Sequence, residues 1–397
     1  MKIGFVTPWF ADDIPGGSEA AIYGIVSNLK AAGIDVEILA TCVEKFLSDW
    51  NVDFYPPGDD IAAGTVIRRF PVRKRDTGVF DKINYKLMNN ISVSYEEERI
   101  FLKEMVNSPA LYEYIDKQQE SYSLFVFTPY MFGTTYYGCR LCPERSVVLP
   151  ALHDESYAYM EHFKEVFPKV RGMLFNSEAE RRLGERLYDL ADVDVSVIGN
   201  GTKTDVSGNP DDFKTKYGID DPFILYAGRK DEGKNVHTLI RYFAAYKKQF
   251  SGRLKLVLIG GGNLSVPDYV EDNIKDDIID LGFIPIQDKY DACSASLFLC
   301  QPSLNESFSL VVMESWLCSR PVLVHADCEV TRDFAKKAQG GLFFSDYREF
   351  AGCVDYFISH KEQGDIMAEN GRKYVIDNYR WEIITKKYID YFERLCV

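Results

Sequence analysis

Short apolar runs alternate with amphipathic stretches along almost the entire chain. An unbroken apolar run of about four to eight residues is typical of a buried strand, whereas apolar positions three and four residues apart indicate a helix. Residues 18–32 follow the helical pattern, with Ile22, Ile25, Val26 and Leu29 on one face. Apolar runs predict strands at 2–7, 36–40, 124–128, 146–149, 172–175, 223–227, 254–259, 297–301 and 321–324.

Signals at the ends of helices support this alternation. Gly33 follows the first amphipathic stretch, and glycine favours the left-handed conformation of a helix end. Ser177-Glu-Ala-Glu180 has the form of a capping box that opens another helix. Further helices are expected at 236–250, 308–318 and 374–395, the last of which is rich in aromatic residues.

One stretch between residues 195 and 212 is crowded with turn-forming residues, namely Gly199, Asn200, Gly201, Gly208, Asn209 and Pro210. Such density marks a linker, and 397 residues are enough for two domains of about 100–200 residues. We therefore predict an α/β protein with two Rossmann-like domains, 1–203 and 204–376, and a helical segment at 377–397. Such folds bind ligands beyond the carboxyl ends of their strands, so functional residues should follow strands directly.

The composition is that of a globular protein, with 46% hydrophobic and 27% charged residues. A net charge of −14 argues against nucleic-acid binding. No apolar run approaches the ~20 residues of a membrane span, and the N-terminus lacks the apolar length of a signal peptide, so we expect a cytoplasmic protein. The nine cysteines are scattered, which favours reduced thiols. Cys139 and Cys142 form a CxxC, for which a redox pair is the alternative.

Two glutamates bracket the turn after the predicted strand 297–301. Glu306 falls in the loop, and Glu314 falls about two turns into the predicted helix. The N–H groups of 307–310 would then lie at a helix N-terminus, which favours negative charge. Amides and the helix dipole suit a diphosphate, and the carboxylates suit sugar hydroxyls. An ordinary helix start with an exposed glutamate is the alternative.

Two groups of cations stand out in this acidic chain. Arg229 and Lys234 follow the strand 223–227, where a guanidinium fork and an ammonium suit a diphosphate; a basic loop before a helix is the alternative. Five bases also lie within 68–75, namely Arg68, Arg69, Arg73, Lys74 and Arg75. They indicate either a solvated strand edge or loop, or a contact with an anionic acceptor or the cytoplasmic membrane leaflet.

Two further loops follow strands of the first half. Gly16 and Gly17 come after the first strand and allow close approach of a ligand to the backbone. They do not form the GxGxxG of nicotinamide-binding proteins. His153 and Asp154 follow the strand 146–149. That histidine suits a hydrogen bond to a sugar hydroxyl, and a structural role is the alternative.

Taken in order, these residues resemble the retaining GT-B glycosyltransferases of family 4 (glycosyltransferase group 1), which include bacterial mannosyl-, glucosyl- and galactosyltransferases. The resemblance covers nearly the whole chain and implies two Rossmann-like domains that face each other across a cleft, with the C-terminal helix returning to the first. The motifs that carry it are Gly16-Gly17, His153-Asp154, Asn200-Gly201, Gly228-Arg229 with Gly233-Lys234, Gly260 to Gly262, and Glu306 with Glu314.

The resemblance assigns the donor, a nucleotide-diphosphate sugar, mainly to the second domain. Arg229 and Lys234 would bind the diphosphate, Glu314 the ribose hydroxyls, and Glu306 the hexose. His153 would also reach the hexose. Further donor contacts are expected from Gly16, Gly17, Gly228, Gly261, Ser307, Phe308, Ser309 and Leu310. The family usually has E-G-F-G at the first glutamate, and Glu306-Ser-Phe-Ser309 departs from it by adding side chains where the backbone would approach the ligand.

The reaction implied is retaining transfer of a hexose to an acceptor hydroxyl, with Glu306, Arg229, Lys234 and His153 as catalytic residues. No side chain is placed as a nucleophile, so we expect front-side displacement in which the leaving phosphate takes the acceptor proton. Asp192-Val-Asp194 matches the DxD of metal-dependent glycosyltransferases but lies near the linker. We expect it to be surface acidity, and we expect no metal and no cofactor besides the donor.

The acceptor is expected to be a glycan or lipid-linked glycan of surface polysaccharide or lipopolysaccharide synthesis. The first domain would bind it through Asp154, and Arg73, Lys74 and Arg75 would contact the acceptor or the membrane. UDP-, GDP- and dTDP-sugars are all compatible with these residues, as is any oligomeric state. Two other functions are considered: a non-hydrolysing sugar-nucleotide epimerase, and a non-catalytic glycosyltransferase-like subunit.

Overall fold

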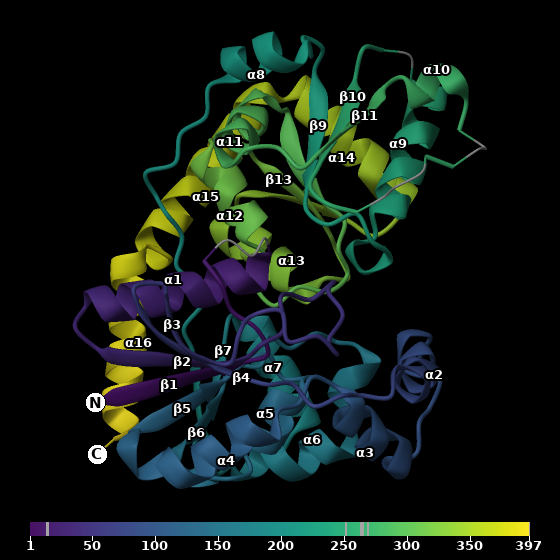
Figure 1. Cartoon of the computed structure of the whole chain (residues 1–397). Coiled ribbons are helices and arrows are strands. Elements are labelled where there is room, and N and C mark those ends of the chain that lie inside the picture. Colours follow the sequence, from purple (N-terminus) through teal and green to yellow (C-terminus); the bar gives the residue numbers. More distant parts are fainter. Residues whose placement is uncertain (13–15, 251, 263–265, 268–269, 397) are drawn as a thin grey trace. The chain divides into compact units, whose positions relative to one another are not determined.

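The computed structural model of the protein describes residues 1–12, 16–250, 252–262, 266–267 and 270–396 (Figure 1). The chain divides into two compact units. Unit 1 comprises Met1–Gly201 and Trp381–Val397, and unit 2 comprises Thr202–Arg380. The predicted boundaries at residues 203 and 376 lie two and four residues from these divisions. A helix with the length and apolarity of a membrane span is not found in the described part of the chain.

Unit 1 is built on an eight-stranded sheet with the order β3-β4-β2-β1-β5-β6-β7-β8. All neighbouring strands are parallel except β3 and β4. The strands are β1 (Lys2–Thr7), β2 (Asp35–Thr41), β3 (Gly58–Ala62), β4 (Thr65–Phe70), β5 (Leu124–Phe127), β6 (Ser146–Val148), β7 (Gly172–Phe175) and β8 (Asp194–Val197). The five strands listed above for this half are therefore present, β8 lies where a strand was expected to border the Asp192–Asp194 motif, and β3 and β4 were not predicted.

Helices lie on both sides of this sheet, with α1 on one side and α4 and α5 on the other (Figure 1). The four apolar residues predicted to face inward from α1 are all buried. The helices of unit 1 are α1 (Gly17–Ala31), α2 (Thr77–Met88), α3 (Tyr95–Glu104), α4 (Pro109–Gln118), α5 (Gly133–Gly138), α6 (Glu161–Val166), α7 (Glu178–Leu187) and α16 (Trp381–Leu395).

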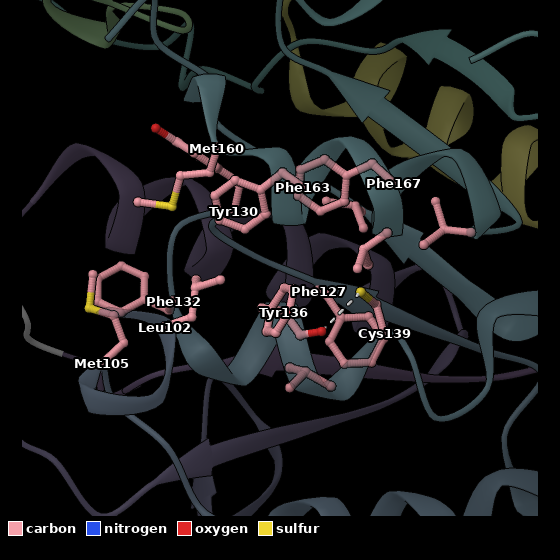
Figure 2. Close-up of a cluster of buried hydrophobic side chains, with 14 of the residues drawn as sticks. Leu102, Met105, Phe127, Tyr130, Phe132, Tyr136, Cys139, Met160, Phe163 and Phe167 are labelled. Carbon is pink, nitrogen blue, oxygen red and sulfur yellow. Dashed lines mark hydrogen bonds between the residues drawn. The ribbon is translucent and has the colours of Figure 1, made fainter. Parts of the chain in front are cut away.

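The core of unit 1 is strongly aromatic, and Figure 2 shows part of it. Tyr130, Phe163 and Phe167 form a continuous contact, since Phe163 lies 5.4 Å from Tyr130 and 5.1 Å from Phe167 between ring centroids. Cys139 is packed into the same cluster. Burial raises the pKa of Cys139 to about 12 and that of Cys142 to about 11. The reactive thiolate is therefore disfavoured at both positions of the CxxC.

The capping box predicted at the start of α7 is only half formed. Ser177 caps the helix, because its hydroxyl accepts the N–H of Glu180 at 3.1 Å. The two carboxyl oxygens of Glu180 also reach beyond the helix start and accept the N–H groups of Leu152 and Asn176, each at 2.5 Å. The carboxyl group therefore joins the loops after β6 and β7.

The aromatic C-terminal stretch forms two helices, where one was predicted over 374–395. The first, α15, ends at Asn378, and α16 begins at Trp381. They separate because Tyr379 leaves the helix and its carbonyl accepts the N–H of Thr202 at 2.8 Å. As expected, α16 returns to unit 1. There Arg394 binds Asp194 at 2.7 Å, and Trp381 packs against Gly24 of α1.

Unit 2 has a six-stranded, entirely parallel sheet with the order β11-β10-β9-β12-β13-β14. The strands are β9 (Phe223–Ala227), β10 (Lys255–Ile259), β11 (Ile278–Gly282), β12 (Phe298–Gln301), β13 (Val322–His325) and β14 (Gly341–Phe344). The helices are α8 (Pro210–Tyr217), α9 (Val236–Gln249), α10 (Asp272–Lys275), α11 (Ile286–Ala295), α12 (Leu310–Leu317), α13 (Glu329–Ala338), α14 (Tyr347–Ser359) and α15 (Lys361–Asn378). The four predicted strands are present, and the two strands at the sheet edges, β11 and β14, were not predicted.

Candidate functional site

The loops that follow β9, β10 and β11 are joined at the carboxyl edge of the unit 2 sheet. Gly228 donates to the carbonyl of Ile259 at 3.0 Å, and Gly260 donates to that of Gly282 at 2.8 Å. Gly260 has a φ of 117°, and a Cβ there would lie 2.1 Å from the Gly228 carbonyl oxygen. Only glycine fits this approach. The glycine-rich loops are therefore packed on one another.

A buried ion pair holds the same loops together. Lys230 is 4% exposed, and its ammonium lies 2.5 Å from the carboxylate of Asp280 in β11. Its backbone N–H donates to the Gly261 carbonyl at 2.7 Å. Sequence reasoning missed both side chains. Arg229 was expected to face a ligand, but the sequence pattern gives no sign that the adjacent Lys230 is buried.

Lys234 and Glu306 are brought together although 72 residues separate them. The Lys234 ammonium lies 2.7 Å from Glu306 Oε1, and the side chains are 20% and 10% exposed. Gln301, the last residue of β12, donates to the same oxygen at 3.3 Å. Asn235 donates to the Pro302 carbonyl at 3.0 Å, which ties the two loops side by side. An ammonium and a carboxylate thus share one site at the ends of β9 and β12.

Arg229 belongs to the same loop but has a more open environment. Its side chain is 55% exposed, and its Nε lies 3.3 Å from the carboxylate of Asp231. The hydroxyl of Tyr226 donates to its carbonyl oxygen at 2.5 Å, which fixes the backbone where β9 ends. The guanidinium is therefore accessible to solvent while its backbone is held.

The helix α12 begins at Leu310, two residues later than the predicted start at 308. Ser309 is the N-cap of α12, with a φ of 82° and no capping hydrogen bond from its side chain. This is the left-handed region that favours glycine. Phe308 is 2% exposed and packs on Phe334 and Tyr379, with ring centroids 5.3 and 5.1 Å apart. Its ring is a core group, so only its backbone is available to a donor.

Glu314 lies in the second turn of α12 and is paired with Lys289 of α11. The Lys289 ammonium is 2.6 Å from Glu314 Oε1, and the side chains are 23% and 16% exposed. Both residues line a small pocket, whose other walls are Leu225, Ala227, Tyr290, Cys293, Leu299 and Val311. The two predicted glutamates are therefore each held by a different lysine.

In unit 1, Gly16 and Gly17 lie where β1 leads into α1, and Pro15 of that motif lies outside the described residues. A Cβ on Gly16 would be 2.1 Å from the carboxylate of Glu19. Glu19 in turn accepts the indole N–H of Trp9 at 3.0 Å. A small pocket lies beside these groups and is lined by Thr7, Pro8, Trp9, Phe10, Ala11, Ser18, Glu19, Ile22 and Pro129.

His153 and Asp154 follow β6, at the same carboxyl edge as Gly16. His153 Nδ1 lies 3.6 Å from Glu155, and its side chain is 31% exposed. The Asp154 carboxylate is bound by Arg186 at 2.7 Å and by the hydroxyl of Tyr159 at 2.6 Å. Asp154 is thus engaged within unit 1, while the imidazole retains solvent access.

The basic stretch is largely occupied by partners in unit 1. Arg68 binds Glu37 and Asp59, and Arg69 is 4% exposed with its guanidinium donating to the Phe10 carbonyl. Arg73 binds Glu104, and the guanidinium of Arg75 lies 4.7 and 4.0 Å from the ring centroids of Trp50 and Phe80. Lys74 is exposed and donates to the Asn51 carbonyl. These contacts favour a structural role for the stretch.

The DxD also has a partner within unit 1. Asp194 lies at the start of β8, and Arg394 of α16 binds both of its carboxylate oxygens, at 2.7 and 3.2 Å. The Asp194 carbonyl accepts the hydroxyl of Tyr391 at 2.8 Å. A group of three or more metal-ligating side chains is not found in the described ranges. Asp194 thus fastens α16 to the sheet.

A comparison with protein families gives a match that lies within unit 2. The model of the glycosyl transferases group 1 family matches residues 209–374. Unit 2 is therefore similar to the domain that defines the group 1 glycosyltransferases. The match contains Arg229, Lys234, Glu306 and Glu314, so the loops described above are those of this domain.

Curated relatives of the chain are also glycosyltransferases. The N-acetylgalactosamine-N,N'-diacetylbacillosaminyl-diphospho-undecaprenol 4-alpha-N-acetylgalactosaminyltransferase of Campylobacter jejuni is 29% identical over 187 residues, which are 46% of this chain and 42% of that protein. The lipopolysaccharide core biosynthesis glycosyltransferase LpsE of Rhizobium meliloti is 27% identical over 217 residues, 52% and 60% of the two chains. The chain matches only about half the length of these relatives.

Solved structures resemble the whole chain at low identity. Sucrose-phosphate synthase from Thermosynechococcus elongatus is 17% identical, with a TM-score of 0.71, 99% of this chain covered and 98% of the other. HepE of Anabaena in complex with UDP is 14% identical, with a TM-score of 0.71 and coverage of 99% and 100%. At these identities the likeness concerns the fold. The chain has the two-domain, parallel-sheet α/β fold of GT-B proteins.

Proposed function

We propose that this protein is a retaining, metal-independent glycosyltransferase of family 4 that transfers a hexose from a nucleotide-diphosphate sugar to an acceptor hydroxyl. The observation that carries the proposal is the Lys234–Glu306 pair at the carboxyl edge of the group 1 domain, with a separation of 2.7 Å. It joins a cation and a sugar-binding carboxylate where parallel-sheet proteins bind ligands.

The donor diphosphate is assigned to the Arg229 and Lys234 side of this site. The half-exposed Arg229 guanidinium would bind a phosphate, since a guanidinium does so through two parallel hydrogen bonds. Lys234 adds a second cation, and the N-terminus of α12 adds the positive end of a helix dipole. Glu306, held by Lys234 and Gln301, would accept hydrogen bonds from the hexose. His153 of unit 1 would reach the same sugar.

The proposed chemistry is a front-side displacement. The bond between the anomeric carbon and the diphosphate oxygen breaks, and the acceptor oxygen bonds to the same face of that carbon. The acceptor proton passes to the leaving phosphate oxygen, so the products are the glycoside and the nucleoside diphosphate. The protein orients the reactants and stabilises the diphosphate charge through Arg229 and Lys234.

Metal independence is proposed because cations of the protein fill the role of a bound metal. Arg229 and Lys234 supply positive charge at the diphosphate, and the DxD carboxylate of Asp194 is bound to Arg394. We therefore expect transfer to continue in EDTA.

The acceptor is proposed to be a glycan or lipid-linked glycan, bound by unit 1 in the cytoplasm or at the inner face of the membrane. The name of the Campylobacter relative describes a diphospho-undecaprenol acceptor, and that of LpsE places it in lipopolysaccharide core synthesis. Asp154 and the exposed Lys74 are the residues of unit 1 that we assign to contact with the acceptor or membrane, with Arg73 and Arg75 beside them.

The test is substitution of the two cations in the full-length protein. Arg229→Ala and Lys234→Ala should each lower transfer from the preferred donor by at least about tenfold, since a hydrogen bond to a charged group contributes roughly 1.5–3 kcal/mol. Donors are first screened as UDP-, GDP- and dTDP-sugars, and transfer is measured by nucleoside diphosphate release and by mass spectrometry of the product.

Arg253→Ala is the matched control, because Arg253 is 78% exposed and lies before β10, at the opposite end of that strand. Full activity in both cation variants would overturn the proposal. Release of an epimerised nucleotide sugar would identify an epimerase instead, and donor binding without turnover would identify a non-catalytic subunit.

A further inference from the structure

Lys289 and Glu314 form a close ion pair between two helices of the group 1 domain. Lys289 lies in the first half of α11 and Glu314 in the middle of α12, and their charged atoms are 2.6 Å apart. The side chains are only 23% and 16% exposed. Among the described residues, the Glu314 carboxylate has no other hydrogen bond. One oxygen, Oε1, is therefore occupied, and Oε2 is left for another donor.

The pair lines a small pocket whose other walls are mostly apolar. Leu225 and Ala227 of β9, Leu299 of β12 and Tyr290 line it together with the two charged groups. The Lys289 ammonium lies 5.2 Å from the centroid of the Tyr290 ring. A few charged groups beside apolar walls are typical of sites that orient a small polar ligand, and the Glu314 carboxylate can accept hydroxyl donors but would repel a phosphate.

We propose that Lys289 is a positioning residue of the nucleotide site, which orients the Glu314 carboxylate toward the ribose hydroxyls. This inference rests on the proposed function. It extends that function to a residue outside both the Arg229–Lys234 motif and the Glu306–Glu314 motif. A carboxylate has about four lone-pair sites. An ammonium on Oε1 fixes its rotation and leaves Oε2 for hydroxyl donors. The ammonium also offsets the negative charge that Glu314 would otherwise place near a bound diphosphate.

If the ion pair only linked α11 to α12, its removal would lower the stability of the fold. The affinities for nucleotides with and without the ribose hydroxyls would then change equally. The two roles are therefore separated by ligands that differ only in those hydroxyls. A hydrogen bond to a charged acceptor contributes roughly 1.5–3 kcal/mol, which corresponds to about tenfold or more in Kd. Removal of the 2′- or 3′-hydroxyl should weaken binding to the wild type by about this factor.

The experiment measures nucleotide affinity by isothermal titration calorimetry on the full chain. UDP, GDP, ADP and dTDP are screened first, and the tightest of them is compared with its 2′-deoxy and 3′-deoxy forms, with dTDP serving as the 2′-deoxy form of ribothymidine diphosphate. In Lys289→Met, the hydroxyl-bearing nucleotide should bind about tenfold more weakly, and its deoxy form should change by less than about twofold. Lys289→Arg should keep most of the discrimination, and Glu314→Gln should lose it.

Lys216→Met is the matched control. Lys216 binds Asp288, the residue before Lys289 on α11, at 2.6 Å, so this variant removes a neighbouring helix–helix ion pair outside the pocket. It should leave all affinities unchanged. Equal weakening of both nucleotide forms in Lys289→Met, or no weakening, would overturn the role of Lys289. A wild type that binds none of the four nucleotides would overturn the proposed function itself. A wild type that binds a nucleotide more tightly than its deoxy forms would leave that function standing, even if the role of Lys289 were overturned.

Discussion

The carboxyl group of Glu180 is the most deeply buried titratable acid that touches a loop of the candidate site. Glu180 is 1% exposed and accepts the N–H of Leu152, the residue before His153. Burial outweighs the hydrogen bonds it accepts and raises its pKa to about 8. Because the folded protein then holds a proton that the unfolded chain releases near pH 4.5, the stabilising contribution of Glu180 is complete below that pH. It is lost as the pH rises through 8.

Glu180→Gln should remove this pH dependence, since glutamine keeps the shape of the side chain and does not ionise. The difference in unfolding free energy between wild type and variant, measured in urea from pH 4 to pH 9, should shift against the wild type by a few kcal/mol as pH rises. Subtraction of the variant cancels the other titrating groups. A difference that stays constant over the range would contradict the assignment of this proton to Glu180.

The helix α16 is held on unit 1 by contacts that leave no room for added atoms. A Cβ on Gly24 of α1 would lie 2.1 Å from Trp381, and a Cβ on Gly201 would lie 2.2 Å from the same ring. Gly24→Ala should therefore destabilise unit 1 by up to about 2 kcal/mol, because overpacking costs about 1–3 kcal/mol and alanine regains roughly 1 kcal/mol in a helix.

Gly352→Ala in α14 is the control for this substitution. Its added Cβ would meet nothing within 4 Å, so only the helical preference of alanine acts, and stability should rise by about 0.5–1 kcal/mol. Both variants are compared with the wild type by thermal unfolding. If Gly24→Ala were as stable as Gly352→Ala, the close packing of α16 on α1 would be wrong.

The elements that the sequence predicts well are those that are buried throughout. All five residues of β9 are buried, so its apolar run is continuous. By contrast, β3 reads GDDIA with four exposed residues, and β14 has one buried residue of four, so neither has a clear pattern. Edge strands bury fewer side chains than central ones, and their pairing is set by a neighbour distant in sequence. The same reason explains why α15 and α16 looked like one helix, because the break at Tyr379 depends on Thr202.

For the site, the rule that ligands bind beyond strand ends placed Arg229, Lys234 and Glu306 at one sheet edge from sequence alone. The pairing of Lys234 with Glu306 agrees with that expectation in position, while the ligand roles stay predictions. The rule does not identify Lys289 as a site residue, because Lys289 lies within a helix and meets Glu314 only where α11 packs on α12. Nor does it reach Glu180, whose capping-box position gives no sign that its carboxyl group turns to Leu152.

Across the whole molecule, the proposed division of labour assigns the nucleotide mainly to unit 2. A ligand that binds only the folded state stabilises it by about 2.7 kcal/mol at a concentration of 100 Kd, and local protection from hydrogen exchange rises where that ligand binds. We therefore expect saturating nucleoside diphosphate to slow amide exchange in peptides that cover 223–235 and 298–317, which contain the Lys234–Glu306 and Glu314 loops. Peptides of β3 and β4 in unit 1 should exchange at unchanged rates.

The Arg229→Ala, Lys234→Ala double variant separates ligand contact from general tightening of the protein. It removes two cations that the donor would touch, and neither belongs to a hydrophobic core, since the Lys234 and Arg229 side chains are 20% and 55% exposed. The free variant should exchange like the free wild type, and the nucleotide should no longer protect 223–235. A different outcome is protection of peptides around Gly16 and Gly17 with none in unit 2. It would place the nucleotide in unit 1 and reverse the proposed roles of the two units, because a diphosphate is expected to bind one principal set of cations.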